Sequence, residues 1–281
     1  MKVNIFLAGL AIASGSQGLA SGMAVHMFIA DEALEQLSSQ ELQSMLERHR
    51  DAYRMGAVYP DTGYAINHSY GELSHWSDFL NQYQKVLMEA CPDPLKSEDC
   101  QAAWSHFFGS LSHTVGDINF DKYFVTETAR QDFDGDIGKA QEHTDPGCDF
   151  LAILDYKRAF DYPRIDQPND ILIETYRRLG LEVSESEINR GAKTLKLGMV
   201  AEPIGAPFTY LYYKFKMPWG SQNYFDARGG VQDTADRLAI VWDYVWQGLQ
   251  QAEMSNFSNQ GGWPGVSFYI DDFSLDDALS L

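Results

Sequence analysis

Residues 102–124 read AAWSHFFGSLSHTVGDINFDKYF, and their pattern decides the predicted fold class. Apolar side chains such as Leu111 and Val115 recur at three- and four-residue steps, which is the period of an α-helix. His113 and Asp117 are four residues apart and therefore project from the same side of such a helix. The stretch predicts one long helix that packs an apolar face into a core and presents an imidazole beside a carboxylate.

The same helical period recurs on both sides of this stretch, and no segment alternates with the two-residue period of a β-strand. Two segments that lack the period, 55–70 and 126–147, are rich in turn-forming or polar residues and are predicted to be loops, the second with short helical turns. The sequence therefore predicts an all-α helical bundle in a single domain. The further helices are expected at about 26–37, 38–49, 76–87, 150–160, 169–180, 185–200 and 231–254.

The charge balance of the chain excludes some classes of partner. Its 281 residues contain 21 lysines and arginines against 40 aspartates and glutamates, a formal net charge of -19. A protein that binds nucleic acid mainly through phosphate attraction needs the opposite balance. Hydrophobic residues make up 44% of the chain, which is enough for a packed core.

The first twenty residues have the pattern of an export signal. Lys2 supplies the positive start, residues 5–13 are mostly apolar, and Gly18 and Ala20 form a small-x-small cleavage site. The apolar run is too short to span a bilayer, and no later segment is a transmembrane candidate. We expect a secreted or periplasmic protein with a signal peptide at 1–20, a catalytic domain at 21–254 and a C-terminal tail at 255–281.

Three cysteines are present in the chain. Cys91 and Cys100 flank a short polar segment with two prolines, and an exported protein meets conditions in which a disulfide between them forms. Cys148 is then left as a free thiol. It is either reactive or a metal ligand, or a small buried core residue, and we favour the core position.

Histidines and aspartates outside the central helix supply further candidate ligands. His26 opens the first helix, Asp61 follows a proline in a predicted loop, and His75 precedes a helix start. His143 and Asp149 belong to the second polar segment and its end. Each alone also fits a structural role. Together, nitrogen and oxygen ligands without a cysteine pair are typical of catalytic rather than structural zinc.

At these positions the chain resembles the zinc-dependent phospholipase C superfamily, and within it the glycosylphosphatidylinositol-specific phospholipase D branch. The resemblance covers most of residues 21–254 and is most specific in four motifs. These are HMFIA at 26–30, GAVYPD at 56–61, SHW at 74–76, and FG at 108–109 with SHTVGD at 112–117.

The resemblance implies an all-helical domain of the phospholipase C and related zinc nuclease type, with two to three Zn²⁺ ions. By motif position, the first ion has four ligands: Asp61, His75, His113 and Asp117. Asp61 is also the expected catalytic residue, a general base for the attacking water.

The remaining ions are expected on either side of Asp117, which would bridge to an ion bound by His26. A further ion is assigned to His143 and Asp149. Where the family has a histidine soon after the bridging aspartate, this chain has Asp121, which we expect to be an oxygen ligand in its place.

The implied function is hydrolysis of the headgroup phosphodiester of a phospholipid, of phospholipase C or D type, with a zinc-activated water. Two alternatives remain: a zinc nuclease of the related branch, and a metal-binding relative without turnover. The substrate is expected at a membrane surface. An aromatic segment at 210–219, which includes Phe215 and Lys214, fits either membrane docking or core packing, and we favour core packing.

Overall fold

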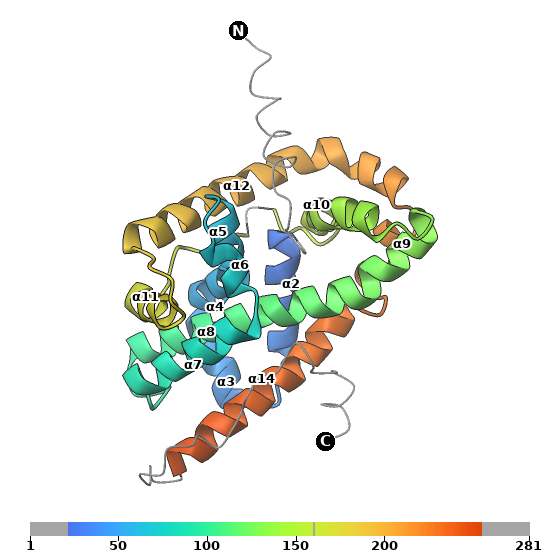
Figure 1. Ribbon diagram of the computed structural model, residues 1–281. Coiled ribbons are helices and arrows are strands. Elements are labelled where there is room, and N and C mark those ends of the chain that lie inside the picture. Colours follow the sequence, from blue (N-terminus) through green and yellow to red (C-terminus); the bar gives the residue numbers. More distant parts are fainter. Residues whose placement is uncertain (1–21, 160, 255–281) are drawn as a thin grey trace.

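The computed structural model describes residues 22–159 and 161–254, which fold as helices joined by short connections (Figure 1). No β-strand occurs in these two ranges, so the all-α prediction is confirmed. The elements are α2 (Met23–Gln36), α3 (Gln40–Arg48), α4 (Arg50–Val58), α5 (Asp61–Tyr64), α6 (Tyr70–Ser74), α7 (Ser77–Ala90), α8 (Glu98–Asn119), the π-helix η1 (Phe120–Val125), α9 (Thr126–Asp132), α10 (Ile137–Asp155), α11 (Asn169–Arg178), α12 (Glu185–Lys216), α13 (Gly220–Asn223) and α14 (Val231–Met254).

Helices α4 and α8 pack with their backbones almost in contact, and two glycines make this approach sterically allowed. A Cβ atom on Gly109 would overlap the carbonyl oxygen of Tyr53, and one on Gly56 would overlap that of His106. Only glycine leaves room for a neighbouring backbone at such positions. This packing fixes the position of α8 along its axis relative to α4, and therefore the position of His113 on α8.

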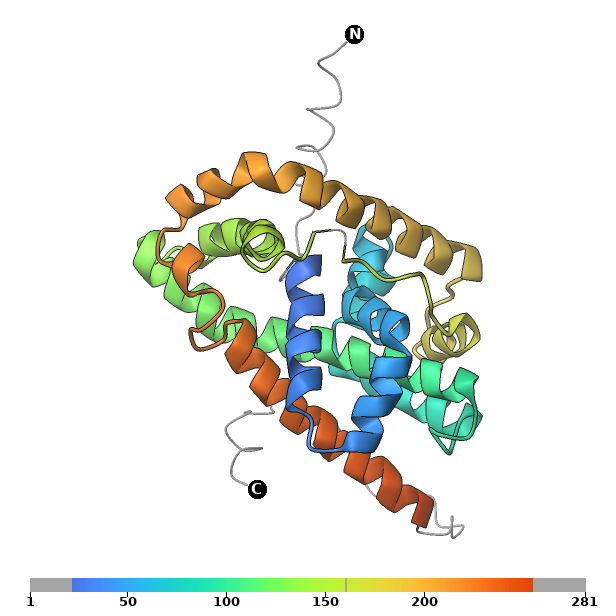
Figure 2. The ribbon, with the colours of Figure 1, turned by 180° about the vertical axis from the view of Figure 1, so that it is seen from behind.

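Helix α14 covers the other side of α8 and runs along α2 (Figures 1 and 2). Trp242 and Trp246 are fully buried, and the indole nitrogen of Trp242 donates to the backbone oxygen of Phe108 at 2.9 Å. The apolar face expected for 231–254 is therefore confirmed.

Helix α12 lies along one edge of the bundle, beside α10 and α5 (Figures 1 and 2). It was expected to end near residue 200, and it continues to Lys216 through Pro203 and Pro207. Pro207 is exposed, and a proline inside a helix removes one backbone hydrogen bond without ending the helix here. The extension carries the 210–219 aromatic segment onto a helix surface.

The prediction of a loop at 55–70 is correct for 59–60 and 65–69 and wrong for the rest. Helix α4 continues to Val58, and Asp61 is the first residue of the short helix α5. Pro60 directly precedes it, where the missing backbone N–H costs no hydrogen bond. The glycines and the proline that suggested a loop serve close packing and a helix start instead.

For 126–147 the expectation was an irregular loop with short helical turns; the segment is instead mostly helical, with α9 and the first half of α10 separated by an irregular connection at 133–136. The side chain of Asp136 accepts from the backbone N–H of Lys139 and caps α10, and Pro146 lies inside that helix. These turns are largely exposed on one side, so their polar composition reflects a solvated helix face.

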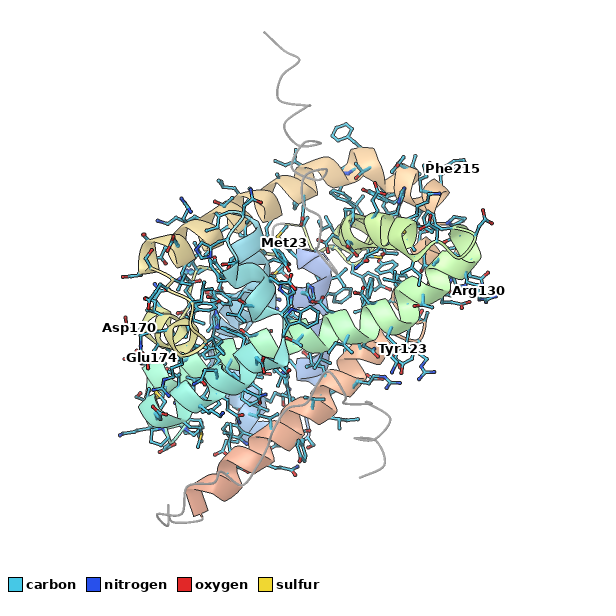
Figure 3. The ribbon with its side chains drawn as sticks, in the orientation of Figure 1. Met23, Tyr123, Arg130, Asp170, Glu174 and Phe215 are labelled. Atoms are coloured by element: carbon cyan, nitrogen blue, oxygen red, sulfur yellow. A yellow bond between two sulfur atoms is a disulfide. The ribbon has the colours of Figure 1, made fainter. Side chains whose placement is uncertain are left out.

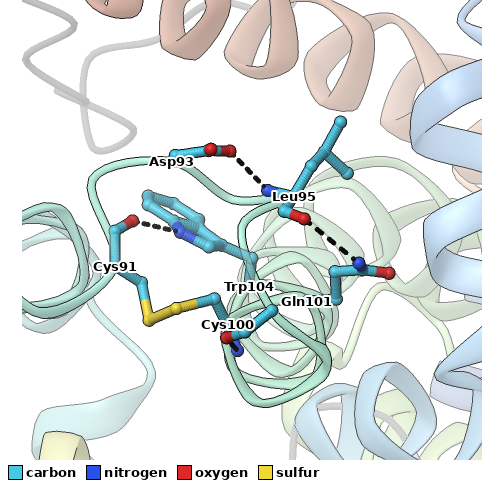
Figure 4. The surroundings of a disulfide bond; sticks show 7 residues. Cys91, Asp93, Leu95, Cys100, Gln101 and Trp104 are labelled. Carbon is cyan, nitrogen blue, oxygen red and sulfur yellow. Dashed lines mark hydrogen bonds between the residues drawn. A yellow bond between two sulfur atoms is a disulfide. The ribbon is translucent and has the colours of Figure 1, made fainter.

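The expected disulfide joins Cys91 at the end of α7 to Cys100 in the first turn of α8 (Figure 4). Trp104 is buried beneath it and donates from its indole nitrogen to the Cys91 backbone oxygen at 3.0 Å. Cys148 is a buried free thiol, as its interpretation as a core residue requires.

The predicted signal peptide at 1–20 and the tail at 255–281 lie outside the described residues. Within the described part, no helix combines the length and the apolar character needed to cross a membrane.

Candidate metal centre

The centre is built around His113 and Asp117 on α8. The Nδ1 atom of His113 lies 2.8 Å from the backbone oxygen of Ala57, and because a carbonyl only accepts, Nδ1 is the donor. The lone pair is therefore on Nε2, which is 3.3 Å from Oδ2 of Asp117. Burial and the neighbouring His26 lower the pKa of His113 to about 4. The ring is thus neutral at pH 7, in the form that binds metal ions.

His26 on α2 lies directly against this pair. Its ring stacks on that of His113 with centroids 3.8 Å apart, and its Nε2 is 3.2 Å from Oδ1 of Asp117. Burial would lower the pKa of His26, but the charge and hydrogen bond of Asp117 raise it instead. Asp117 therefore lies between two imidazoles, as a bridging carboxylate requires.

His75 follows α6 and approaches from the opposite side. Its Nδ1 is 2.7 Å from the backbone oxygen of Gly71, to which it donates, and its Nε2 is 3.5 Å from Oδ1 of Asp61. Burial would lower the pKa of His75, whereas the contact with Asp61 and the charge of Asp117 raise it to about 9. Backbone carbonyls thus orient both His75 and His113, the arrangement usual for metal-ligating histidines.

Asp61 gives the clearest sign of a cation position. The residue is 1% exposed, and neither carboxylate oxygen has a hydrogen-bond partner among the described residues. A buried carboxylate without hydrogen-bond partners is costly unless a cation compensates its charge, and either protonated His75 or a metal ion beside it does so. The α5 backbone holds Asp61 in this position, which the sequence analysis had assigned to a loop.

Two overlapping sets of side chains have the compactness of a metal site. His26, His113 and Asp117 form one set, and Asp61, His75 and His113 the other; one donor atom from each residue lies within 4.8 Å of the others in its set. Donor atoms around a tetrahedral zinc ion are separated by roughly 3.4 Å, which these sets can reach by small movements. Imidazole and carboxylate without thiolate are the donors of catalytic zinc sites, so these residues fit zinc.

Asp121, Asp145 and Asp149 form a second, carboxylate-rich side of the centre. Asp121 lies on η1, where burial and the charge of Asp117 raise its pKa to about 7. Its Oδ2 accepts from Gln141 at 3.4 Å, and its Oδ1 is buried without a partner. A π-helix within a long α-helix is frequent at functional sites because it changes the direction of side chains.

Asp149 on α10 contacts the beginning of α2. Its Oδ1 accepts from the backbone N–H of Val25 at 2.8 Å. Burial raises the pKa of Asp149 to about 7 against the opposing effect of the hydrogen bonds from Val25 and Ala24. Backbone N–H groups at the N-terminus of α2 therefore hold this carboxylate in place.

The structure separates His143 from this group. Its Nδ1 lies 3.0 Å from the backbone oxygen of Lys139, one turn back on α10, and its ring packs near Phe133 and Tyr212. On a helix, residues two apart point in different directions. Asp145, two residues further on, is near enough to Asp117 and Asp61 for their charges to raise its pKa.

The sequence analysis did not assign Asp145, which lies between His143 and Asp149, to the site, and it missed Glu202. Asp145 is buried, its Oδ1 has no partner in the described residues, and burial together with Asp121 raises its pKa well above the ordinary value. Glu202 on α12 has a pKa that burial, Asp149 and Asp61 raise in the same way. The four-residue spacing of Asp145 and Asp149 was a usable signal, but only once the segment is recognised as helical.

Comparison with known proteins bears on the same residues. Residues 25–129 match the family model described as zinc dependent phospholipase C. Over this segment the chain is thus similar to the zinc-dependent phospholipase C family. The matched segment contains His26, Asp61, His75 and the α8 pair, and it ends before the carboxylates of α10.

Curated relatives extend the similarity over more of the chain. Phosphatidylinositol-glycan-specific phospholipase D from Bos taurus is 29% identical over 234 residues, which cover 76% of this chain and 28% of the relative. The Homo sapiens protein of the same name is 28% identical over 250 residues, 81% of this chain and 29% of the relative. The chain thus spans less than a third of the length of these relatives. No solved structure was found to match it significantly.

Proposed function

We propose that this chain is a zinc-dependent phosphodiesterase domain that hydrolyses the headgroup phosphodiester of phospholipids, by phospholipase C or D chemistry. The observation that carries the proposal is the buried carboxylate of Asp61, which has no hydrogen-bond partner in the described residues and lies beside His75. The family relationship and the names of the relatives support the same chemistry.

Zinc would be held by two groups of residues. Asp61, His75, His113 and Asp117 are the ligands we propose for one ion, with Asp117 shared toward His26. Asp121, Asp145 and Asp149 are the ligands we propose for the remaining one or two ions. His143, which the motif comparison suggested, is replaced in this assignment by Asp145.

Bound zinc lowers the pKa of a coordinated water and offsets the charge that develops on the phosphoryl oxygens. In our proposal, Asp61 orients the attacking water and accepts its proton. His113 and His75 keep fixed orientations through their bonds to Ala57 and Gly71, so little reorganisation is needed on substrate binding.

A lipid substrate fits the chain better than a nucleic acid. The net charge of -19 opposes the approach of a polyanionic strand, whereas a single phosphodiester at a membrane surface brings one charge. We further propose that the protein is exported, with a signal peptide at 1–20. N-terminal sequencing of protein recovered from outside the cytoplasm tests that point.

The test of the function is a parallel assay of three substrates with the purified protein. Phospholipid vesicles, bis(p-nitrophenyl) phosphate and single-stranded DNA are each incubated with and without a zinc chelator, and metal content is measured by elemental analysis. We expect two to three zinc ions per chain and hydrolysis of vesicle lipid that chelation abolishes and added zinc restores.

Each other outcome selects an alternative. Cleavage of DNA but not of lipid would replace the proposal with a zinc nuclease. No turnover of any substrate by the zinc-loaded chain would leave a metal-binding relative without catalysis.

A further inference from the structure

Helix α12 is apolar on two opposite sides. One side is buried in the bundle and includes Leu195, Met199 and Tyr213. The other side carries exposed large hydrophobic residues, and four of them form what we call the outer stripe. Their exposed fractions are 72% for Leu197, 63% for Ile204, 75% for Leu211 and 81% for Phe215.

The spacing of the outer stripe is helical. Its members follow one another at steps of seven, seven and four residues, which at 3.6 residues per turn places them within roughly 40° around the axis. The stripe extends along roughly 27 Å of helix. Figure 3 shows Phe215 near the outer end of α12, and Figures 1 and 2 show this helix at the edge of the bundle.

A continuous apolar surface of this length is unusual on a soluble protein. Scattered exposed hydrophobic residues are normal, but contiguous ones mark sites that bind a protein or a membrane. Half of the exposed large hydrophobic residues in the described part of the chain lie between Leu197 and Phe215. The stripe is therefore a candidate docking surface.

Charge distinguishes this surface from the rest of the protein. Residues 190–216 contain five basic residues and one acidic residue, in a chain with 21 basic and 40 acidic residues. Arg190 and Lys193 are exposed at one end of the stripe, and Lys214 and Lys216 flank the other. The acidic residue, Glu202, is on the side that interacts with the metal centre.

Aromatic rings accompany the lysines at the C-terminal end. The Nζ atom of Lys214 lies 4.4 Å from the ring centroid of Tyr210, and that of Lys216 lies 5.8 Å from that of Tyr212. Tyrosine and lysine side chains have an apolar body and a polar tip, and such residues are favoured at membrane–water interfaces. Tyr212 and Phe215 are exposed, contrary to the core position that the sequence analysis favoured.

We propose that the outer stripe docks on the surface of a phospholipid bilayer. Leu197, Ile204, Leu211 and Phe215 enter the boundary between headgroups and acyl chains, and the basic residues contact headgroup phosphates. Local positive charge beside an apolar helix face matches an anionic lipid interface, as in interfacial amphipathic helices. This positive region attracts phosphate groups that the net charge of -19 would otherwise repel.

Docking in this orientation deepens the proposed function and rests on it. The opposite face of the same helix carries Glu202, whose charge interacts with Asp149 and Asp61. A bilayer bound along the outer stripe is therefore separated from the metal centre by the thickness of α12. A phospholipid headgroup has only this short distance to cover between the bilayer and the metal centre.

Vesicle co-sedimentation of the full chain tests the proposal separately from catalysis. The probes are phosphatidylcholine vesicles with and without one-fifth phosphatidylserine. The variant L211S/F215S removes two stripe residues four positions apart, and I240S/Y244S is a matched control. Ile240 and Tyr244 are also four apart and exposed, and they lie on α14. Turnover of soluble bis(p-nitrophenyl) phosphate is measured for all three proteins.

We expect wild type and I240S/Y244S to bind the mixed vesicles equally and L211S/F215S to bind about tenfold more weakly or worse, because two apolar side chains lose their burial in lipid. Turnover of the soluble diester stays unchanged in the three proteins.

Equal binding by both variants, or no binding by wild type, overturns the docking proposal. A wild-type dimer that L211S/F215S dissociates, measured by light scattering, overturns it in favour of a second copy. If wild type does not hydrolyse the soluble diester, the proposed function is contradicted, whereas the vesicle-binding result still stands.

Discussion

The two sides of the metal centre differ in how they are prepared for a cation. On the histidine side, backbone carbonyls at 2.8 and 2.7 Å orient His113 and His75, and one donor atom of each residue belongs to the same compact set with Asp61. On the carboxylate side, burial raises the pKa of Asp121 to about 7 and that of Asp145 well above its ordinary value. The first side is preorganised, whereas the second depends on the charge that occupies it.

This difference has a physical origin. A backbone carbonyl that accepts from Nδ1 orients His113 and His75 and leaves Nε2 of each ring directed at the site, so one hydrogen bond per ring sets this geometry. His75, with a pKa of about 9, must release a proton to bind a metal ion. Several carboxylates in one buried place repel one another and take up protons. A cation that binds there must displace those protons, which makes affinity on this side dependent on pH.

The largest expected effect is on the histidine side. His113→Ala removes the residue shared by both sets of donor atoms, so we expect zinc affinity to fall by about 100-fold or more and phosphodiesterase turnover to disappear. Zinc titration and elemental analysis measure the first quantity. Circular dichroism checks that the helical fold remains.

His143→Ala is the matched control, because this histidine is also on a long helix but lies away from the donor sets. It should retain zinc and turnover. An equal loss in both variants would show that the two histidines contribute alike, contrary to the structure.

The second effect tests whether the close packing of α4 against α8 holds the histidine side of the centre in place. Gly109→Ala puts a methyl group against the Tyr53 carbonyl and forces α4 and α8 apart, which should cost roughly 2–3 kcal/mol of unfolding free energy. Because Ala57 moves with α4, zinc affinity should fall as well. Urea unfolding and zinc titration measure the two changes.

Gly138→Ala is the corresponding control on α10. The added methyl group meets only the Asp136 side chain at 3.6 Å, and alanine favours a helix, so stability should stay equal or rise slightly. If Gly109→Ala is as stable as Gly138→Ala, close backbone packing does not position the centre.

The third effect is the pH dependence of the unfolding free energy that the carboxylate side causes in metal-free protein. The folded-state pKa of Asp121 is about 7, while an unfolded aspartate ionises near 4. Between these values the folded state keeps a proton that the unfolded state releases, so the unfolding free energy falls as pH rises. From pH 5 to pH 7 this group contributes a loss of about 2 kcal/mol in chelator-treated protein.

Urea unfolding at several pH values checks this slope in wild type and in Asp121→Asn, which lacks the titrating group and should show a flatter dependence. Asp170→Asn, an exposed substitution on α11, is the control and should keep the wild-type slope. Saturating zinc should also flatten the wild-type slope. Identical slopes in wild type and Asp121→Asn would rule out a buried proton at this position.

The smallest expected effect distinguishes zinc binding on the carboxylate side of the centre from zinc binding on the histidine side. Asp145→Asn should weaken the ion bound by the carboxylates about tenfold and leave the ion bound at His75 and His113 unchanged. Calorimetric zinc titration resolves the two binding steps. Glu142→Gln, on the exposed face of the same helix, should alter neither, and an unchanged second step in Asp145→Asn would remove Asp145 from the ligand set.

Sequence periodicity succeeded where helices carry a strong apolar face. Residues 231–254 bury Trp242 and Trp246 as predicted, and the Cys91–Cys100 disulfide is present. It failed for the helical parts of 55–70, because a glycine used for helix packing has the same local signature as a glycine used for a turn. It failed again at 126–147, where polar residues cover a solvated helix face.

The sequence by itself determined the histidine side of the centre. The four-residue spacing of His113 and Asp117 fixes their relative direction on any α-helix, since helical geometry depends on local backbone bonds. The sequence also determined the net charge and the helical class, which follow from composition and period.

Only the tertiary structure decided the rest. It left His143 outside both sets of donor atoms, and we propose Asp145 in its place, because the direction of a side chain toward a distant site depends on how α10 packs against α2 and α12. It likewise exposed the outer stripe of α12: an apolar residue becomes core or surface according to whether another element covers it, and local sequence does not specify that partner.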